Sequence, residues 1–253
     1  MELDVGQVVL LGPGEGERLN ERIVVKLERP EISVNEVNVG PDFEGPGPHF
    51  HKEHVDAFYV LEGQLEFTNG TETLLAPAGT SVAVPPNIVH AFTNPGPGGA
   101  RYLNIHAPDG DFIEYLRHAV AGEEFSWDSY DVDEPYEPAE AIVAGPDGGE
   151  RLKRRLLENM IRAETPQLSM FEMTFDERWE GVDPHYHDDH VDSFFVLDGE
   201  VDFLLGDETA RASAGTYVAA PPNVTHGFRP IAPARFLNMH APDAGFAARA
   251  RGR

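Results

Sequence analysis

The feature that most constrains the fold of this chain is an internal repeat. Residues 48–63 read PHFHKEHVDAFYVLEG, and residues 184–199 read PHYHDDHVDSFFVLDG. With the same offset, GTSVAVPPNIVH at 79–90 matches GTYVAAPPNVTH at 215–226. Similarity at a fixed spacing over such long stretches indicates that two copies of one structural unit follow each other in the chain.

The repeat divides the 253 residues into an N-terminal domain, 1–120, a linker, 121–140, and a C-terminal domain, 141–253. The linker is rich in acidic residues and has no Lys or Arg. It also has four aromatic residues, and we expect these to strap it over the protein surface. They are Phe125, Trp127, Tyr130 and Tyr136.

Each copy has the pattern of short strands separated by turns. Apolar residues alternate over short runs, and Gly, Pro and Asn separate the runs, which predicts an all-β sandwich or barrel in each copy. A short amphipathic helix is predicted at 110–120, with a weaker version at the C-terminus. In the run that starts at Asp56, alternate residues are identical in the two copies while those between them differ. The constant face is therefore predicted to point inward, as it is for the later run with His90 and Phe92.

Histidines and a carboxylate are predicted to converge inside each barrel. His49 and His51 are two residues apart, so both imidazoles project from one face of a strand. Asp56 and His90 are expected to point inward from other strands. The second copy has the matching residues His185, His187, Asp192 and His226. Burying four such groups together without a metal would be costly, and the chain has no Cys, so we predict a metal on nitrogen and oxygen ligands in each domain: Fe, Mn, Ni, Cu or Zn.

Further histidines recur in both copies near these candidate ligands. His54, with its counterpart His190, is either a fourth ligand or a loop histidine at the barrel mouth. His106, with its counterpart His240, either lines the pocket as an acid, base or hydrogen-bonding group, or ends a structural strand. The constant inward aromatic residues are further candidates for the pocket wall. They are Phe58, Phe92, Phe194 and Phe228.

The residues match the two motifs of the cupin superfamily. The first motif, G-x5-H-x-H-x(3,4)-E-x6-G, is matched by His49, His51 and Gly63. An aspartate, Asp56, takes the place of its glutamate. The second motif, G-x5-P-x-G-x2-H-x3-N, is matched with a longer spacing by Gly70, Pro77, Gly79, His90 and Asn94. The C-terminal copy matches at His185, His187, Asp192, Gly199, Gly206, Gly215 and His226. The chain therefore resembles a tandem bicupin, which implies one metal-binding jelly-roll β-barrel in each domain.

The resemblance is to bacterial quercetinase-like bicupins, which implies a metal-dependent dioxygenase acting on a small aromatic or enolic substrate. Three histidine ligands leave coordination positions free for substrate and O2. The constant inward residues other than the candidate ligands are apolar and aromatic, and the pattern places no Lys or Arg among them. This favours a largely apolar substrate over a sugar phosphate. Asp56 and Asp192 are predicted to bind the metal, directly or through water, or to act as the catalytic base. A metal-dependent isomerase or lyase, and a non-catalytic bicupin that binds metal and small molecules, remain alternatives.

Charge limits the partners that the sequence predicts. The chain has 44 acidic residues against 19 Lys and Arg, a formal net charge of −25. This field repels phosphate groups, so we expect a small-molecule substrate and neither nucleic acid nor a membrane as partner. The acidic start MELDVGQVVLLG lacks the features of a secretion signal, and we expect a cytoplasmic protein. Assembly into a homo-oligomer is left open.

Overall fold

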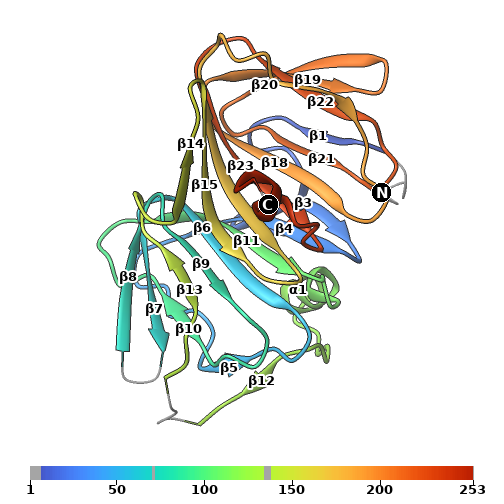
Figure 1. Ribbon diagram of the computed structural model, residues 1–253. Helices are drawn as coiled ribbons and strands as arrows, with labels where there is room; N and C mark the ends of the chain where they lie inside the picture. Colours follow the sequence, from blue (N-terminus) through green and yellow to red (C-terminus); the bar gives the residue numbers. More distant parts are fainter. Residues whose placement is uncertain (1–6, 70–71, 134–137, 253) are drawn as a thin grey trace. The chain divides into compact units, whose positions relative to one another are not determined.

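The structure, a computed structural model, describes residues 7–69, 72–133 and 138–252 (Figure 1). Strands dominate these ranges, which contain two short helices, α1 (Phe112–Ala121) and α2 (Phe246–Ala250). Neither helix is long and apolar enough to cross a membrane. The predicted all-β class and the short helix after each copy are confirmed. Two residues named above, Gly70 of the second motif and Tyr136 of the linker, lie outside the described ranges.

The first compact unit, Glu17–Gly149, is called here the N-terminal barrel. Its strands are β2 (Glu17–Arg18), β3 (Ile23–Arg29), β4 (Ile32–Val39), β5 (His49–Phe50), β6 (Val55–Glu62), β7 (Gln64–Asn69), β8 (Glu72–Pro77), β9 (Ser81–Val84), β10 (Ala91–Thr93), β11 (Ala100–Ala107), β12 (Tyr130–Asp131) and β13 (Ile142–Ala144). An antiparallel seven-stranded sheet has the order β13-β9-β6-β11-β4-β3-β2, and a second sheet the order β10-β7-β8. The pair β12-β5 forms a small third sheet.

The second compact unit, called here the C-terminal barrel, contains Glu150–Arg253 and also the segment Met1–Gly16. Its strands are β1 (Val9–Leu11), β14 (Glu150–Lys153), β15 (Leu157–Glu164), β16 (Ser169–Phe175), β17 (Val182–His185), β18 (Val191–Asp198), β19 (Glu200–Leu205), β20 (Glu208–Ser213), β21 (Tyr217–Ala220), β22 (His226–Pro230) and β23 (Ala234–Ala241). The seven-stranded sheet has the order β1-β21-β18-β23-β16-β15-β14, and the four-stranded sheet the order β17-β22-β19-β20. Each barrel is thus a two-sheet jelly roll.

The boundaries of the two units differ from those predicted from the repeat. The first strand of each copy adds to the sheet that contains the rest of the other copy: β1 pairs with β21, and β13 pairs with β9. The linker, predicted to be separate, belongs to the N-terminal barrel as far as the structure describes it. Sequence similarity identifies which segments are equivalent, but it does not say to which sheet an edge strand forms its hydrogen bonds.

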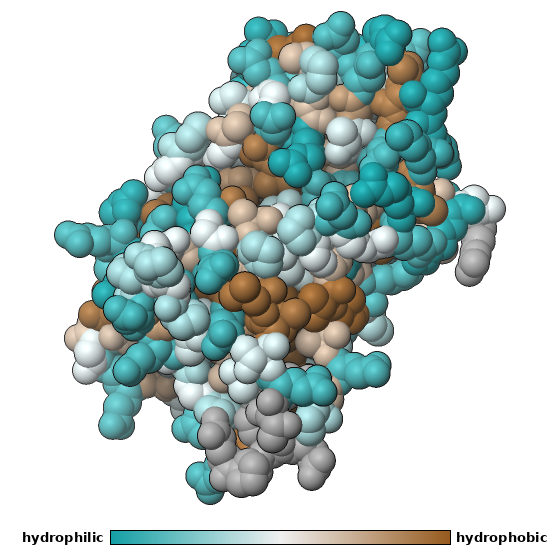
Figure 2. Space-filling view, turned by 90° about the vertical axis from the view of Figure 1, so that its left-hand side faces the viewer, coloured by the Kyte–Doolittle hydropathy of each residue, from teal (hydrophilic) through white to brown (hydrophobic). Residues whose placement is uncertain are grey.

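The predicted inward residues form the core of each barrel. Phe58 and Phe92 pack with residues of both sheets in the N-terminal barrel, and Phe194 and Phe228 do so in the C-terminal barrel. The face predicted to point outward is also buried, since Tyr59 has only 2% of its surface exposed. Hydrophilic residues nevertheless cover most of the molecular face in Figure 2, as the high content of acidic residues leads one to expect.

Strand register brings together the residues that were singled out in the sequence. On neighbouring strands β6 and β11, His106 lies directly opposite Asp56. In the C-terminal barrel, His240 lies opposite Asp192 in the same way. Because residues opposite each other in a sheet have side chains on the same face, each histidine is brought next to its carboxylate.

We predict that Gly199→Ala destabilises the C-terminal barrel more than Gly206→Ala does. Both glycines have a positive φ, of 77° and 63°, so alanine at either position costs about 1 kcal/mol. A Cβ at Gly199 would lie 2.2 Å from the carbonyl oxygen of Pro233, whereas one at Gly206 would meet nothing within 4 Å. Relieving that clash should add at least about 2 kcal/mol, which a urea unfolding curve followed by circular dichroism would measure. Equal losses for the two variants would contradict this account of the turn.

Candidate metal centres

The structure brings the predicted ligands of each copy into one cluster. In each cluster, one ligand atom from each of four residues lies within 4.8 Å of the other three. The N-terminal cluster is His49, His51, Asp56 and His90, and the C-terminal cluster is His185, His187, Asp192 and His226. All four N-terminal residues are buried, while His185 and His187 are partly exposed. These sets contain no other residue, so the grouping agrees with the one predicted from the repeat.

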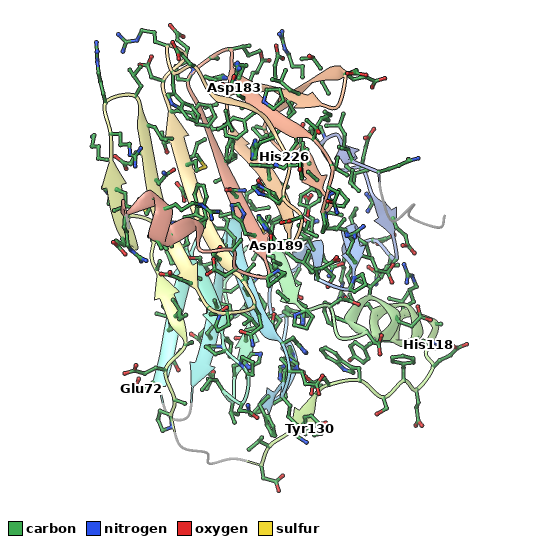
Figure 3. The ribbon with its side chains drawn as sticks, turned by 45° about the vertical axis from the view of Figure 1, so that its right-hand side comes forward. Glu72, His118, Tyr130, Asp183, Asp189 and His226 are labelled. Carbon is green, nitrogen blue, oxygen red and sulfur yellow. The ribbon has the colours of Figure 1, made fainter. Side chains whose placement is uncertain are left out.

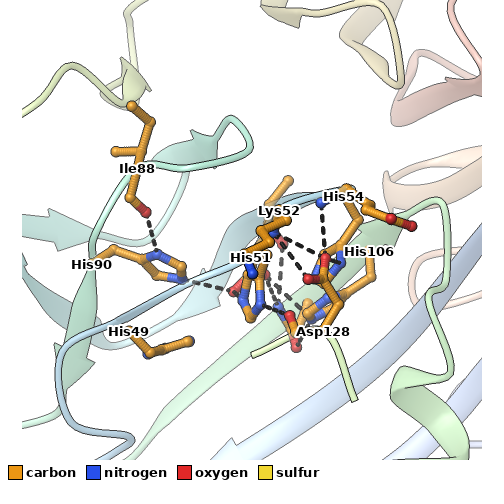
Figure 4. A network of polar contacts seen from close by, with 12 residues as sticks. His49, His51, Lys52, His54, Ile88, His90, His106 and Asp128 are labelled. Carbon is orange, nitrogen blue, oxygen red and sulfur yellow. Dashed lines mark hydrogen bonds and ion pairs between the residues drawn. The ribbon is translucent and has the colours of Figure 1, made fainter. Parts of the chain in front are cut away.

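Backbone carbonyls orient the imidazoles of the N-terminal cluster (Figure 4). His49 donates its Nδ1–H to the carbonyl of Gly47 at 2.8 Å. His90 donates its Nδ1–H to the carbonyl of Ile88 at 3.1 Å. In both cases the acceptor is two residues earlier in the chain. Because the proton is on Nδ1, the lone pair is on Nε2 and points into the cluster, as a metal ligand requires.

The carboxylate of Asp56 is held on one side and faces the cluster on the other. Its Oδ1 accepts a hydrogen bond from Nδ2 of Asn104 at 2.6 Å, and Nε2 of His106 lies 3.3 Å from the same oxygen. Its Oδ2 lies 3.2 Å from Nε2 of His90 and 3.8 Å from Nε2 of His51. Asn104 and His106 therefore fix the carboxylate so that Oδ2 is directed at the histidines.

These distances fit a transition-metal ion. Ligands about 2.1 Å from one ion are about 3.0 Å apart at a right angle and about 3.4 Å apart at the tetrahedral angle. The separations of Oδ2 of Asp56 from the Nε2 atoms of His90 and His51, 3.2 and 3.8 Å, are close to these values. Nε2 of His51 is buried and has no hydrogen-bond partner among the described residues. A cation would satisfy these converging lone pairs, and the spacing suits direct coordination by Asp56 rather than through water.

Electrostatics keep the N-terminal cluster in the state that a metal needs. Burial alone would raise the pKa of Asp56, but the neighbouring imidazoles of His106, His51 and His90 outweigh it, and the pKa is well below the usual range. Burial, followed by the neighbouring His90, lowers the pKa of His49 to about 4. At neutral pH the carboxylate is therefore ionised and this imidazole is neutral, so neither has to lose a proton to bind a metal.

The C-terminal cluster repeats this geometry. Asn238 donates its Nδ2–H to Oδ1 of Asp192 at 2.6 Å. Oδ2 of Asp192 lies 3.1 Å from Nε2 of His226 and 3.6 Å from Nε2 of His187. His185 donates its Nδ1–H to a backbone carbonyl two residues earlier, at 2.9 Å, as His49 does. The second set of residues thus offers a metal the same four ligands.

Charge is balanced somewhat differently in the second cluster. Burial acts to raise the pKa of Asp192, but the neighbouring imidazoles of His240, His187 and His226 lower it overall. Burial acts to lower the pKa of His226, but the hydrogen bond with Asp192 outweighs it and the pKa is raised. Burial lowers the pKa of His240 to about 4. The carboxylate therefore favours positive charge at the centre of its cluster, which a metal ion can supply.

The other recurrent histidines lie around the clusters. His54 and His190 are outside the four-residue sets and lie in the loops just before β6 and β18, where both are buried. Their rings lie 4.1 Å from the ring of His51 and 4.0 Å from that of His187. His106 contacts the carboxylate of Asp56, as described, and lines a cavity.

A cavity of about 480 Å³ adjoins the N-terminal cluster and includes His49, His51 and Asp56 in its wall. Its remaining wall includes six aromatic residues: Phe43, Phe92, Tyr102, Phe112, Tyr115 and Trp127. Of the aromatic residues predicted for this pocket, Phe92 lines the cavity, whereas Phe58 lies behind it in the core. Phe194 and Phe228 are likewise core residues of the C-terminal barrel. The inward face of a strand continues from the site into the packed core. The alternation of residues along a strand therefore does not distinguish residues that line the cavity from residues of the core.

Two parts of the wall were not predicted from the sequence. Arg22, an exposed residue just before β3, lines the cavity, although no inward basic residue had been identified. Arg22 lies outside the alternating strand pattern, so that pattern does not predict on which side its side chain lies. The linker contributes Trp127, Ser129 and Asp131, although it was predicted only to cross the surface. The aromatic residues of the linker were the one sequence feature that could have indicated its part in the cavity wall.

Comparison with known proteins agrees with this fold. A family model of the cupin domain matches residues 35–106 and 171–240. The chain therefore belongs to the cupin family. The quercetin 2,3-dioxygenase of Bacillus subtilis (strain 168) is 24% identical over 266 residues, which cover 87% of this chain and 78% of that protein.

Solved structures resemble the chain over most of its length at low sequence identity. Protein Ylba from E. coli superimposes with a TM-score of 0.67 and 14% identity, covering 94% of this chain and 92% of that one. A salicylate 1,2-dioxygenase from Pseudaminobacter salicylatoxidans has a TM-score of 0.66 and 11% identity, covering 90% and 78% of the two chains. At these identities the likeness establishes the fold and leaves the activity to the site.

We predict that the two clusters bind metal independently. Protein purified without an affinity tag should contain about two equivalents of metal per chain, and the double variant His49→Ala with His51→Ala about one, because removing two ligands abolishes one site. The matched control, His185→Ala with His187→Ala, should also retain about one equivalent, and the quadruple variant almost none. Elemental analysis gives these values. Metal content that is the same in all four proteins would rule out both assignments.

Proposed function

We propose that this cupin is a metal-dependent dioxygenase that acts on a small aromatic or enolic molecule. In this proposal, each cluster holds one divalent transition metal, and the substrate binds in the cavity beside the N-terminal cluster. The observation that carries the proposal is that two of the ligand histidines, His49 and His51, and the ionised Asp56 border a cavity of about 480 Å³ whose wall includes six aromatic side chains. Cavities of roughly 300–1,000 Å³ are typical of sites for small molecules.

The wall of the cavity supports an aromatic or enolic substrate. Phe92, Tyr102 and Trp127 present ring surfaces to it. Aromatic rings pack favourably on a flat, unsaturated molecule in offset or edge-to-face arrangements. Arg22, in the same wall, would suit an acidic or carbonyl substituent, since a guanidinium binds such oxygens with several donors. The cavity is therefore suited to a planar molecule with oxygen substituents.

The roles of the residues follow from their contacts. His49, His51, His90 and Asp56 would hold the metal, which when bound would make a substrate hydroxyl more acidic and allow it to react with O2. Asp56 lines the cavity, and its Oδ2, the oxygen that Asn104 does not hold, would accept the hydroxyl proton from the substrate. Asn104 holds the other oxygen of that carboxylate. The carboxylate can therefore receive the proton without turning away from the histidines.

The named relatives support the reaction type. A quercetin 2,3-dioxygenase and a salicylate 1,2-dioxygenase share the fold over most of this chain. Both names describe dioxygenases. The site described here has the ligands and the free space that such a reaction needs, whereas an isomerase or lyase would need the same ligands but no oxygen.

We predict that Asp56→Asn lowers O2 uptake at least about a hundredfold, because the amide neither carries the negative charge nor accepts the proton as a carboxylate does. The matched variant Asp192→Asn should lower it much less, since the substrate cavity adjoins the N-terminal cluster. The measurement is O2 consumption by protein reconstituted with Fe, Mn, Ni, Cu or Zn, against a panel of flavonols, catechols and related enols. Metal content is determined on the same samples.

Three outcomes decide between the candidate functions. A large loss of O2 uptake with Asp192→Asn and none with Asp56→Asn would place the reaction in the C-terminal barrel and contradict the proposal. Substrate turnover that continues without oxygen would indicate the isomerase or lyase. The absence of O2 uptake with every metal and compound, together with tight ligand binding, would indicate a non-catalytic binding protein.

A further inference from the structure

One of the three N-terminal ligand histidines depends on the linker for its orientation. His49 and His90 donate to carbonyls two residues away, but His51 donates its Nδ1–H to the carbonyl of Asp128, 77 residues later, at 2.6 Å. Asp128 lies in a segment, residues 123–133, that follows α1 and that we call the strap. The direction of Nε2 of His51, and hence its use as a ligand, is thus set by the strap.

The side chain of Asp128 fixes the position of its own carbonyl (Figure 4). Its carboxylate accepts the backbone N–H of Lys52, at 3.0 Å, and of Glu53, at 2.8 Å. The same carboxylate accepts the Nδ1–H of His54 at 3.1 Å. These three donors belong to the turn that follows His51. Asp128 therefore joins the strap to the ligand loop through both its backbone and its side chain.

Aromatic contacts hold the strap on either side of Asp128. Trp127 packs against the ring of His51 at 5.0 Å and against Tyr115 of α1 at 4.8 Å. Tyr130, labelled in Figure 3, stacks on Phe50 at 5.2 Å, and its strand β12 pairs with β5. The strap thus covers β5, which carries His49 and leads into His51, and this agrees with its predicted attachment through aromatic residues.

The C-terminal cluster offers an internal comparison. Within the part of the chain that the structure describes, no carbonyl accepts a hydrogen bond from His187, the counterpart of His51. The side chain of His187 is 19% exposed, against 2% for His51. Tyr186, the counterpart of Phe50, is 62% exposed. His190 bonds instead to the adjacent, exposed Asp189.

We propose that Asp128 is a positioning residue for the N-terminal metal site, and that through His51 it makes this site bind metal more tightly than the C-terminal site. Groups that orient a ligand histidine typically change metal affinity by about tenfold to a hundredfold when they are removed. The two sites, nearly identical in their four ligands, would therefore differ because the strap orients His51, whereas among the described residues no such segment contacts His187. This inference requires the metal sites but not the dioxygenase activity.

Titration with Co²⁺, followed by its visible absorption, tests the proposal in proteins that keep one site each. The variant His185→Ala with His187→Ala leaves the N-terminal site, and His49→Ala with His51→Ala leaves the C-terminal site. The N-terminal site should bind Co²⁺ about tenfold to a hundredfold more tightly. Adding Asp128→Ala to the first protein should remove most of that difference, whereas Asp128→Asn, which keeps one acceptor oxygen, should restore part of it.

A matched control and a second readout separate positioning from general damage. Asp189→Ala in the protein with only the C-terminal site should change its affinity by less than about threefold, because Asp189 bonds to His190 and not, among the described hydrogen bonds, to the ligand His187. Trp127 is one of two tryptophans, so Trp179→Phe makes its fluorescence a report on the strap. Asp128→Ala should make Trp127 more accessible to acrylamide, and Asp128→Asn should do so less.

The outcomes are distinct. Equal Co²⁺ affinities of the two single-site proteins would overturn the proposal, as would an Asp128→Ala variant whose strap is released but whose affinity is unchanged. If Asp128→Ala lowers the yield of folded protein, the graded effect of Asp128→Asn on affinity decides the question alone. Failure of both single-site proteins to bind Co²⁺ would instead defeat the metal sites themselves.

Discussion

The structure depends on an unfavourable convergence of electron-rich atoms. In the N-terminal barrel, backbone carbonyls accept hydrogen bonds from the Nδ1–H groups of His49 and His51, so their Nε2 lone pairs point inward, toward the same cluster as a carboxylate oxygen of Asp56. Such an arrangement is costly inside a protein unless a positive charge lies at its centre. Strand register, the turns that supply the carbonyls, and Asn104 all act to maintain it. The barrel is therefore best understood as a rigid frame that holds these atoms in place for a metal ion.

The C-terminal barrel has the same arrangement of ligands, but the residues around the ligands differ between the two barrels. The ligand distances in the two clusters agree closely: 3.2 Å between Asp56 and His90, and 3.1 Å between Asp192 and His226. What differs is the covering of the site, since the strap places Trp127 and a carbonyl over the N-terminal ligands. Affinity, exposure and access to substrate can consequently differ between two sites that have the same ligands.

The sequence predicted the parts of this molecule that follow from local periodicity and from the repeat. Strand alternation placed Asp56 and His90 on inward faces, and the repeat identified His185 and His187 as the partners of His49 and His51. The alternation of residues along a strand does not distinguish inward residues that line the cavity from those in the core. Phe58 was therefore expected in the cavity wall but lies in the core. Strand alternation also does not predict contacts between segments that are far apart in the sequence. The exchange of the first strands, the place of Arg22 in the cavity wall, and the bond from His51 to Asp128 depend on tertiary packing, for which the sequence has no periodic signal.

The central claim is that two metal ions bind at these two clusters, and anomalous diffraction from crystals of Co²⁺-loaded protein tests it most directly. The account predicts two peaks in the anomalous difference map for each chain. One should lie among Nε2 of His49, His51 and His90 and Oδ2 of Asp56, and the other among their counterparts in the C-terminal barrel. Peaks confined to surface carboxylates, or a map with no peak at either cluster, would contradict it.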